Sequence, residues 1–161
     1  MKFTHLKTPL NKYTFKAPKI KAWVTQRCQG YVLNLFAGET LLDVNEYRND
    51  IRENMVADSH MDALEFCKSY EGRLFNTIIL DPPYAFRKSM EMYEGAICSP
   101  FNRLKDAIIP LLSDGGKVIT FGYHSVSMGA KRGFYVEELC IMSHGGAIHD
   151  TIATIERRAK A

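Results

Sequence analysis

The stretch NTIILDPPYAFRK, residues 76–88, carries the clearest chemical signal in the chain. A β-branched strand pattern ends at Asp81, and Pro82 and Pro83 then follow, which cannot donate to a sheet ladder. The prolines stiffen the segment and leave Asp81 Oδ and the Pro82 carbonyl oxygen as acceptors. Two acceptors aimed at one NH₂ group would hold that nitrogen with its lone pair outward, while the Tyr84 ring stacks on a base for roughly 1–3 kcal/mol. The stretch is predicted to clamp the amino group of a planar base; a proline-rich turn capped by an aspartate is the weaker alternative.

A second motif, LNLFAGET, covers residues 33–40. A strand followed by the small Ala37–Gly38 turn lets a ligand approach the backbone closely. The motif lacks the further glycines of a dinucleotide fingerprint and the Lys-Ser/Thr pair of a P-loop. Glu39 would repel a phosphate, so the turn suits a ligand that is neutral or cationic near Gly38.

Two acids follow this motif. Asp50 ends a weak strand pattern, where a carboxylate can accept two ribose hydroxyls; a surface acid at a strand end is an equal alternative. Asp62, in SHMDALEF, can accept from an adenine amino group. An acid in the first turn of a helix, favoured by the helix dipole, is the stronger alternative for Asp62 taken alone.

Hydrophobic patterns predict the elements that position these residues. Strands are expected at 31–36, 46–51, 54–58, 75–80 and 117–123, helices at 17–28, 60–70 and 99–112, and a closing hairpin at 134–143 and 147–158. Residues 1–16 are expected to be irregular, and SDGG (113–116) to be a turn. Apolar strands interleaved with helices indicate an α/β fold: a mostly parallel sheet covered by helices on both faces, with an antiparallel strand from the hairpin. Ligands of such sheets bind at the carboxyl ends of the strands.

Composition narrows the class of protein. With 161 residues, 46% of them hydrophobic, the chain is expected to form a basic arm (1–16) and a single domain (17–161). No apolar run approaches the length of a membrane span, and the basic N-terminus lacks the apolar block of a signal peptide, so we expect a cytoplasmic protein. The four cysteines lack zinc-ligand spacing, and no metal is expected. Residues 1–30 hold seven Lys/Arg and no acid, whereas 39–94 hold twelve Asp/Glu against six Lys/Arg. This asymmetry suggests a polyanion contact at one end and a cationic ligand in the middle; a solvated tail is an equal alternative.

The order of these motifs resembles the class I S-adenosylmethionine-dependent methyltransferases, in the group that methylates amino nitrogens. LNLFAGET resembles the family's first glycine-bearing motif, DPPY its catalytic motif, and TFKAPKIKAW (14–23) the segment that touches the cofactor's methionine end. The resemblance implies a Rossmann-like mixed sheet with S-adenosyl-L-methionine as cofactor. It implies catalytic roles for Asp81, Pro82, Pro83 and Tyr84. It implies a cofactor site drawn from Lys19, Asn34, Phe36, Ala37, Gly38, Glu39, Thr40, Asp50, Asp62, Ala63 and Asp81.

The chain also departs from the family pattern. Asn34 stands where the family usually has an acid, and Glu39-Thr40 replaces the second glycine. Only twelve positions separate Gly38 from Asp50, too few for the usual helix and strand. The first helix of the family is therefore expected to be missing or reduced to a turn.

The favoured function is methyl transfer to an exocyclic amino group of a nucleic-acid base, with N6 of adenine in DNA first, because DPPY rather than an asparagine- or serine-led motif points that way within the family. The basic arm, with Arg87 and Lys88, is expected to contact phosphates; a solvated helix face is an equal alternative for Arg87 and Lys88. No segment is long enough for a target-recognition domain, so a homodimer or a recognition partner is expected to supply that role. Alternatives are an RNA adenine or guanine N-methyltransferase, a non-catalytic subunit that keeps the fold, and an enzyme with a small-molecule acceptor.

Overall fold

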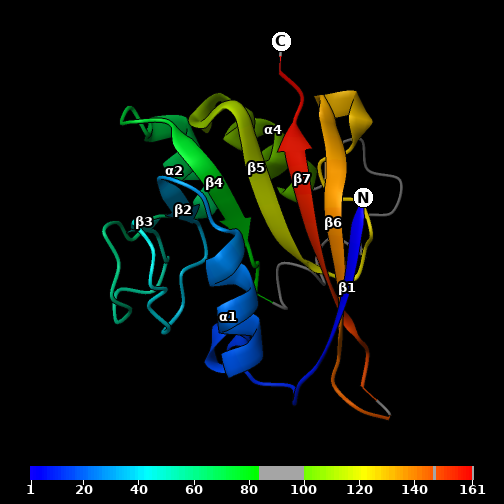
Figure 1. The fold of residues 1–161 in the computed structure, drawn as a ribbon. Helices are drawn as coiled ribbons and strands as arrows, with labels where there is room; N and C mark the ends of the chain where they lie inside the picture. Colours follow the sequence, from blue (N-terminus) through cyan, green and yellow to red (C-terminus); the bar gives the residue numbers. More distant parts are fainter. Residues whose placement is uncertain (84–99, 147, 161) are drawn as a thin grey trace.

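A computed structural model describes residues 1–83, 100–146 and 148–160. Their strands form one sheet in the order β1-β6-β7-β5-β4-β2-β3 (Figure 1). The strands are β1 Lys2–Lys7, β2 Val32–Asn34, β3 Glu46–Arg48, β4 Phe75–Leu80, β5 Leu112–Gly122, β6 Phe134–Ser143 and β7 Thr151–Arg158. All neighbours are parallel except β7, which runs antiparallel to both β5 and β6. The predicted mixed sheet with an antiparallel strand from the closing hairpin is confirmed.

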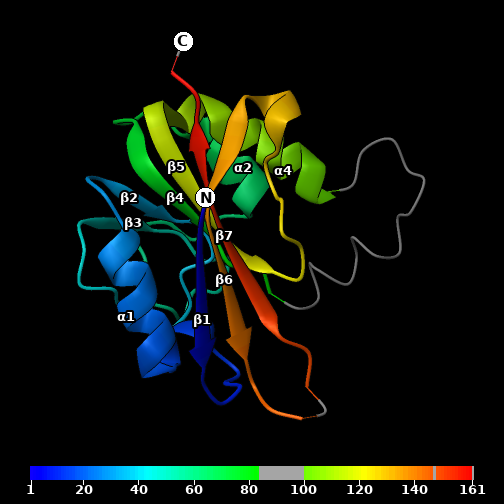
Figure 2. The same ribbon diagram turned by 45° about the vertical axis from the view of Figure 1, so that its right-hand side comes forward.

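Helices cover both faces of the sheet, as predicted. The described helices are α1 Pro18–Arg27, α2 Ala63–Ser69 and α4 Pro100–Ile108, with short 3₁₀ turns η1 Thr14–Lys16, η2 Ile109–Leu111 and η3 Ala130–Arg132. Figures 1 and 2 show α1 on one face and α2 with α4 on the other. Successive residues of a strand point to opposite faces. Ile79 accordingly packs in the core with Trp23 of α1, whereas Ile78 packs in the core with Leu104 of α4.

The sequence patterns correctly predicted the positions of several helices and strands. Strands β4 and β6 occupy the predicted ranges 75–80 and 134–143. In α1 the three residues expected on one face, Ile20, Trp23 and Val24, are buried. Residues 35–45, between β2 and β3, contain no helix, as the short spacing between Gly38 and Asp50 indicated. Ser99, the expected N-cap of the helix at 99–112, lies outside the described residues.

Three expectations about the chain's local structure are wrong. Residues 1–16 are not irregular throughout, because Lys2–Lys7 pairs in parallel with β6, a partner 136 positions away at both ends of the ladder. Residues 54–58 form turns rather than a strand, because they bond to Arg48. The Arg48 Nε–H donates to the Val56 carbonyl oxygen, and the Arg48 carbonyl oxygen accepts from the Asp58 N–H. The SDGG stretch lies inside β5 as a bulge, since β4 pairs with Leu112 and then next with Lys117.

Candidate functional site

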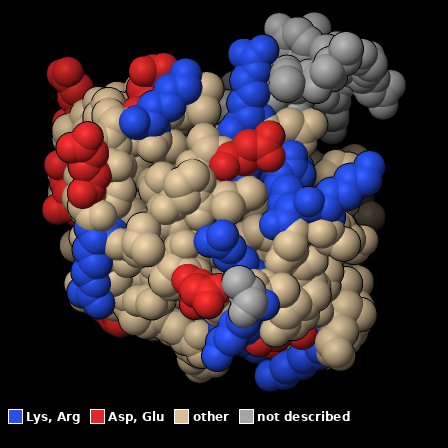
Figure 3. Space-filling model, turned by 90° about the horizontal axis from the view of Figure 1, so that it is seen from above, with Lys and Arg blue, Asp and Glu red and all other residues tan. Residues whose placement is uncertain are grey.

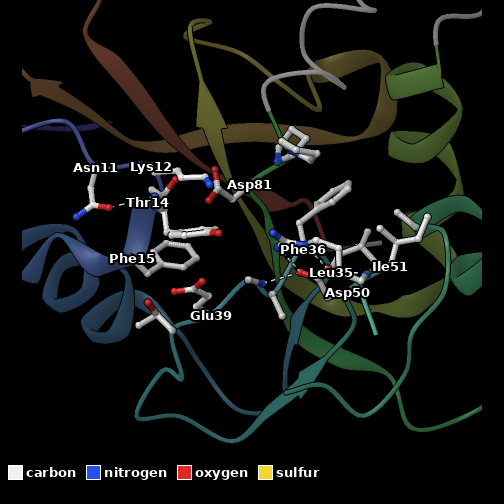
Figure 4. A pocket seen from close by; sticks show the side chains of 18 of the residues that line it. Asn11, Lys12, Thr14, Phe15, Leu35, Phe36, Glu39, Asp50, Ile51 and Asp81 are labelled. Carbon is white, nitrogen blue, oxygen red and sulfur yellow. Dashed lines mark hydrogen bonds and ion pairs between the residues drawn. The ribbon is translucent and has the colours of Figure 1, made fainter. Parts of the chain in front are cut away.

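The carboxyl ends of β2, β3 and β4 surround a cavity of about 1070 Å³, together with a segment of the N-terminal region and the start of β7. Eleven of the residues predicted from the sequence line it: Phe36, Ala37, Gly38, Glu39, Thr40, Asp50, Asp62, Ala63, Asp81, Pro82 and Pro83. Figure 4 shows Asn11, Lys12 and Thr14 on one side of this cavity and Phe36, Asp50 and Ile51 on the other, with Asp81 between them. The structure thus brings together predicted residues from Phe36 to Pro83, which lie up to 47 positions apart in the sequence.

Two predicted cofactor residues lie away from the cavity. Lys19 extends along the exposed side of α1, where its Nζ donates to the Lys7 carbonyl oxygen at 2.9 Å. Asn34 is fully buried at the end of β2, and its Nδ2 donates to Glu46 Oε2 at 3.2 Å. Both residues therefore make contacts within the chain and do not line the cavity. Tyr84, Arg87 and Lys88 lie outside the described residues.

Arg48 shapes the glycine turn in place of the missing helix. Its side chain is 5% exposed and pairs with Glu46, whose side chain is 6% exposed, at 2.9 Å. The guanidinium donates to carbonyl oxygens of the turn and of the next loop: Ala37 at 3.4 Å, Gly38 at 2.8 Å, Thr40 at 2.8 Å and Val56 at 2.8 Å. Glu46 in turn accepts from Leu42 N–H at 3.0 Å. A buried ion pair thus satisfies polar groups that a helix would have paired internally.

Asp50 is the acid most fully engaged in the cavity wall. It is 5% exposed and accepts from the Gly38 N–H at 2.9 Å and from the backbone N–H of Arg52 at 3.0 Å. The Arg52 guanidinium adds two more bonds, both at 3.0 Å. Burial works to raise the pKa of Asp50, but these hydrogen bonds outweigh it and hold the pKa below its ordinary value. Asp50 is therefore an ionised acceptor at neutral pH.

Asn49 and Asp62 fix the neighbouring strand ends. Asn49 Nδ2 donates to the Leu35 and Met61 carbonyl oxygens, and its Oδ1 accepts from the Met61 N–H. This buried amide ties the end of β2 to the approach to α2. Asp62 is the N-cap of α2, with Oδ2 accepting from the N–H groups of Leu64 and Glu65. The helix-start interpretation of Asp62 is thus confirmed, and its place on the cavity wall leaves a role in cofactor contact compatible with it.

The N-terminal wall of the cavity is cationic and aromatic. Lys12, Lys16 and Arg52 all approach the Tyr13 ring, at 5.4, 5.1 and 6.0 Å from its centroid. Lys16 also pairs with Glu39 at 2.7 Å, and this hydrogen bond and attraction raise the pKa of Lys16 and lower that of Glu39. Glu39 is therefore neutralised by a lysine of the chain itself, rather than standing ready for a cationic ligand as the sequence suggested.

Asp81 and its prolines form the wall opposite the turn. Asp81 comes directly after β4, whose last residue, Leu80, pairs with Thr120 at the centre of the sheet. Pro82 is buried and Pro83 is exposed, so the chain turns outward after Asp81. The strand therefore holds the carboxylate on a rigid, central element at the edge of the cavity, as the sequence pattern predicted.

Sequence reasoning missed four residues that build this site: Arg48, Asn49, Arg52 and Tyr13. One signal for the first three was present, because RNDIR (48–52) places a dense polar run over the end of the strand expected at 46–51. A second signal was KYTFK (12–16), in which two lysines flank two aromatic rings. Neither pattern says which main-chain groups the side chains bind, because those partners lie up to 14 residues away.

No protein-family model matches the chain. No curated protein sequence matches it either. Solved structures do share its fold. The N-methyltransferase NodS of Bradyrhizobium japonicum aligns with a TM-score of 0.59 at 11% identity, over 88% of this chain and 94% of NodS. SMU.1697c of Streptococcus mutans, solved in complex with SAH, aligns with a TM-score of 0.52 at 13% identity, over 85% and 93%.

A tRNA m1G37 methyltransferase of M. jannaschii aligns with a TM-score of 0.56 at 15% identity, over 90% of this chain. The chain spans about half of that longer protein, 49% of its length. At such identities the likeness establishes the fold. The chain has the class I fold of S-adenosylmethionine-dependent methyltransferases.

Proposed function

We propose that the chain is an S-adenosylmethionine-dependent N-methyltransferase that acts on an exocyclic amino group of a nucleic-acid base, with N6 of adenine in DNA as the favoured acceptor. One observation carries the proposal: Asp81, Pro82 and Pro83 line the same cavity as Gly38 and Asp50. The residues proposed to bind the amine and those proposed to bind the nucleoside cofactor therefore line the same cavity.

The described residues fit the cofactor. Gly38 has φ +65°, and a Cβ built there would meet no atom within 4 Å, so the turn leaves open space beside its backbone. The buried carboxylate of Asp50 suits a ribose diol, and Phe36 and Ala63 supply apolar walls for a base. Because Asp62 Oδ2 already caps α2, a contact to the adenine amino group would use its other oxygen. When bound, S-adenosylmethionine supplies a methyl group on a sulfonium.

Asp81 and the Pro82 carbonyl oxygen act by orientation. Both accept N–H bonds from the target amine, which directs the nitrogen lone pair along the line of attack. The prolines hold that geometry at small entropic cost. Transfer would form an N–CH₃ bond as the sulfonium S–CH₃ bond breaks and S-adenosylhomocysteine leaves, and the Asp81 carboxylate would stabilise the positive charge on the amine and accept its proton. The cavity of about 1070 Å³ lies at the upper end of the range of about 300–1,000 Å³ typical of ligand pockets, which suits a ligand as large as a nucleoside cofactor.

The nucleic-acid part of the proposal rests on charge. Lys12, Lys16 and Arg52 gather around Tyr13 at the cavity wall, where phosphates beside a flipped base would lie. Figure 3 looks onto the other end of the molecule, where β7 terminates, and shows acidic and basic side chains together. Charges in that part of the structure pair internally, as in Arg157–Glu137 at 2.7 Å. At the cavity wall Lys16 pairs with Glu39 and Arg52 with Asp50 as well, so Lys12, which lines the cavity beside the proposed base site, is the residue that favours a polyanion there.

RNA is the second candidate acceptor. The specific observation in its favour is that a tRNA m1G37 methyltransferase is among the structures that share the fold. Because of the DPPY motif, N6 of adenine in DNA remains the favoured methyl acceptor.

The test is methyl transfer from radiolabelled S-adenosylmethionine to unmodified DNA and, in parallel, to unmodified total RNA. Asp81→Ala serves as the site control. Lys68→Ala, which removes a lysine on exposed α2, serves as the matched control for a lost side chain. Label in DNA that is lost in Asp81→Ala alone supports the proposal, and digestion then identifies the methylated base. Label only in RNA promotes the second candidate, and label in neither contradicts nucleic-acid methylation by this chain.

A further inference from the structure

The hydrogen bonds of Asp50 leave no acceptor site for a ribose. Its Oδ1 accepts the backbone N–H and the Nε–H of Arg52, both at 3.0 Å. Its Oδ2 accepts Gly38 N–H at 2.9 Å and Arg52 Nη2–H at 3.0 Å. An ionised carboxylate offers about four lone-pair sites, and these four N–H groups fill them.

Two of the four donors are fixed and two are displaceable. The backbone N–H of Gly38 belongs to the turn whose carbonyl oxygens Arg48 binds. The backbone N–H of Arg52 belongs to the loop after β3, where Arg48 binds the Val56 carbonyl oxygen. The Arg52 guanidinium stands on a flexible side chain that is 45% exposed, whereas the Asp50 side chain is 5% exposed. A ribose diol brings two O–H donors, the number that the guanidinium would vacate.

We propose that Arg52 is a displaceable cap on Asp50 and that the ribose hydroxyls of the cofactor bind only by exchanging with its guanidinium. The inference rests on the proposed function, because it assumes a cofactor with a ribose diol at Asp50. Arg52 thus competes with the ligand for one carboxylate, although it lines the cavity. A residue that merely contacted the cofactor would strengthen binding; the cap weakens it.

The cap has a structural benefit in the empty cavity. A buried carboxylate without partners is costly, and Arg52 satisfies Asp50 until the hydroxyls replace it. Once displaced from Asp50, the guanidinium can bind the face of the Tyr13 ring. The Arg52 Cζ lies 6.0 Å from the centroid of that ring.

The first test is calorimetry of S-adenosylhomocysteine binding to the wild-type chain, to Arg52→Ala and to Lys68→Ala, the last being a charge-matched control on α2. We expect Arg52→Ala to bind about threefold to tenfold more tightly, because the lost ion pair is bidentate but partly exposed. Lys68→Ala should bind as the wild type does. Equal or weaker binding by Arg52→Ala, with an unchanged unfolding midpoint, overturns the proposal.

The second test observes the guanidinium directly. In ¹⁵N-arginine-labelled protein, the Arg52 Nε–H resonance is assigned by its loss in Arg52→Lys. Adenosine and S-adenosylhomocysteine should shift it and speed its exchange with water, whereas 2′,3′-dideoxyadenosine at equal occupancy should leave it in place. An unmoved resonance with adenosine overturns the cap. If no form of the chain binds S-adenosylhomocysteine, both the proposed cofactor site and the cap are refuted. If methyl transfer is normal but the wild-type chain and Arg52→Ala bind S-adenosylhomocysteine equally, only the cap is refuted.

Discussion

Replacing Arg48 by methionine should strongly destabilise the fold and weaken the cofactor site together. The substitution keeps apolar length but removes a guanidinium that is 5% exposed, and it leaves the Glu46 carboxylate, 6% exposed, without its cation. Removing one partner of a buried ion pair costs roughly 3–5 kcal/mol. That is a large share of a total domain stability of about 5–15 kcal/mol. We expect the free energy of unfolding in urea to fall by about 4 kcal/mol.

The same change should weaken binding of S-adenosylhomocysteine. Arg48 holds the carbonyl oxygens of Gly38 and Thr40, so its loss frees the turn that carries the Gly38 N–H to Asp50. Fixing the backbone of one residue costs roughly 1–2 kcal/mol, so affinity should fall about fivefold to thirtyfold. Calorimetry below the unfolding midpoint separates this loss from unfolding.

Two companion variants sharpen the test. Glu46→Gln combined with Arg48→Met removes both charges and should recover part of the lost stability, because the remaining buried charge is gone. Arg73→Met, on an exposed arginine, should change stability by no more than about 0.5 kcal/mol. The reasoning is refuted if Arg48→Met costs less than about 1 kcal/mol, or if the double variant is less stable than the single one.

Three further predictions test other parts of the structure. Asp81→Ala should leave S-adenosylhomocysteine affinity unchanged by calorimetry and lower methyl transfer at least about 100-fold; unchanged turnover would rule out the clamp. The pKa of Asp50 is lowered in the fold, so its contribution to stability is present above its unfolded pKa of about 3.9 and is lost as pH falls through the folded value. The stability difference between wild type and Asp50→Asn should therefore stay constant above about pH 5 and shrink only below pH 4, and a decline near neutrality would contradict this. Glu156→Gln should cost about 2 kcal/mol in urea unfolding, because this buried carboxylate accepts three backbone N–H bonds from residues 127–129, and a neutral result would show that those bonds are dispensable.

The sequence alone located what depends on neighbouring residues. The β-branched run at 75–80, ended by Asp81 and two prolines, predicted both a central strand and the acid at its end. Alternation and turn signals predicted the hairpin strands, and the spacing of Ile20, Trp23 and Val24 predicted the buried face of α1. These features follow from backbone geometry and side-chain periodicity within about ten residues, which a sequence displays directly.

Only the tertiary structure decided how the site is held. Strand β1 exists because Lys2–Lys7 finds an edge at β6, a partner far along the chain that its own polar pattern does not reveal. The Asn34 amide donates to the buried Glu46, and Glu39 pairs with Lys16, two contacts that the local sequence patterns do not show. In the absence of the first helix, the Arg48 guanidinium binds carbonyl oxygens of the two loops that flank β3. The physical reason is shared: each backbone edge or polar side chain bonds to a partner in another segment of the chain, and only folding brings that partner within hydrogen-bond distance.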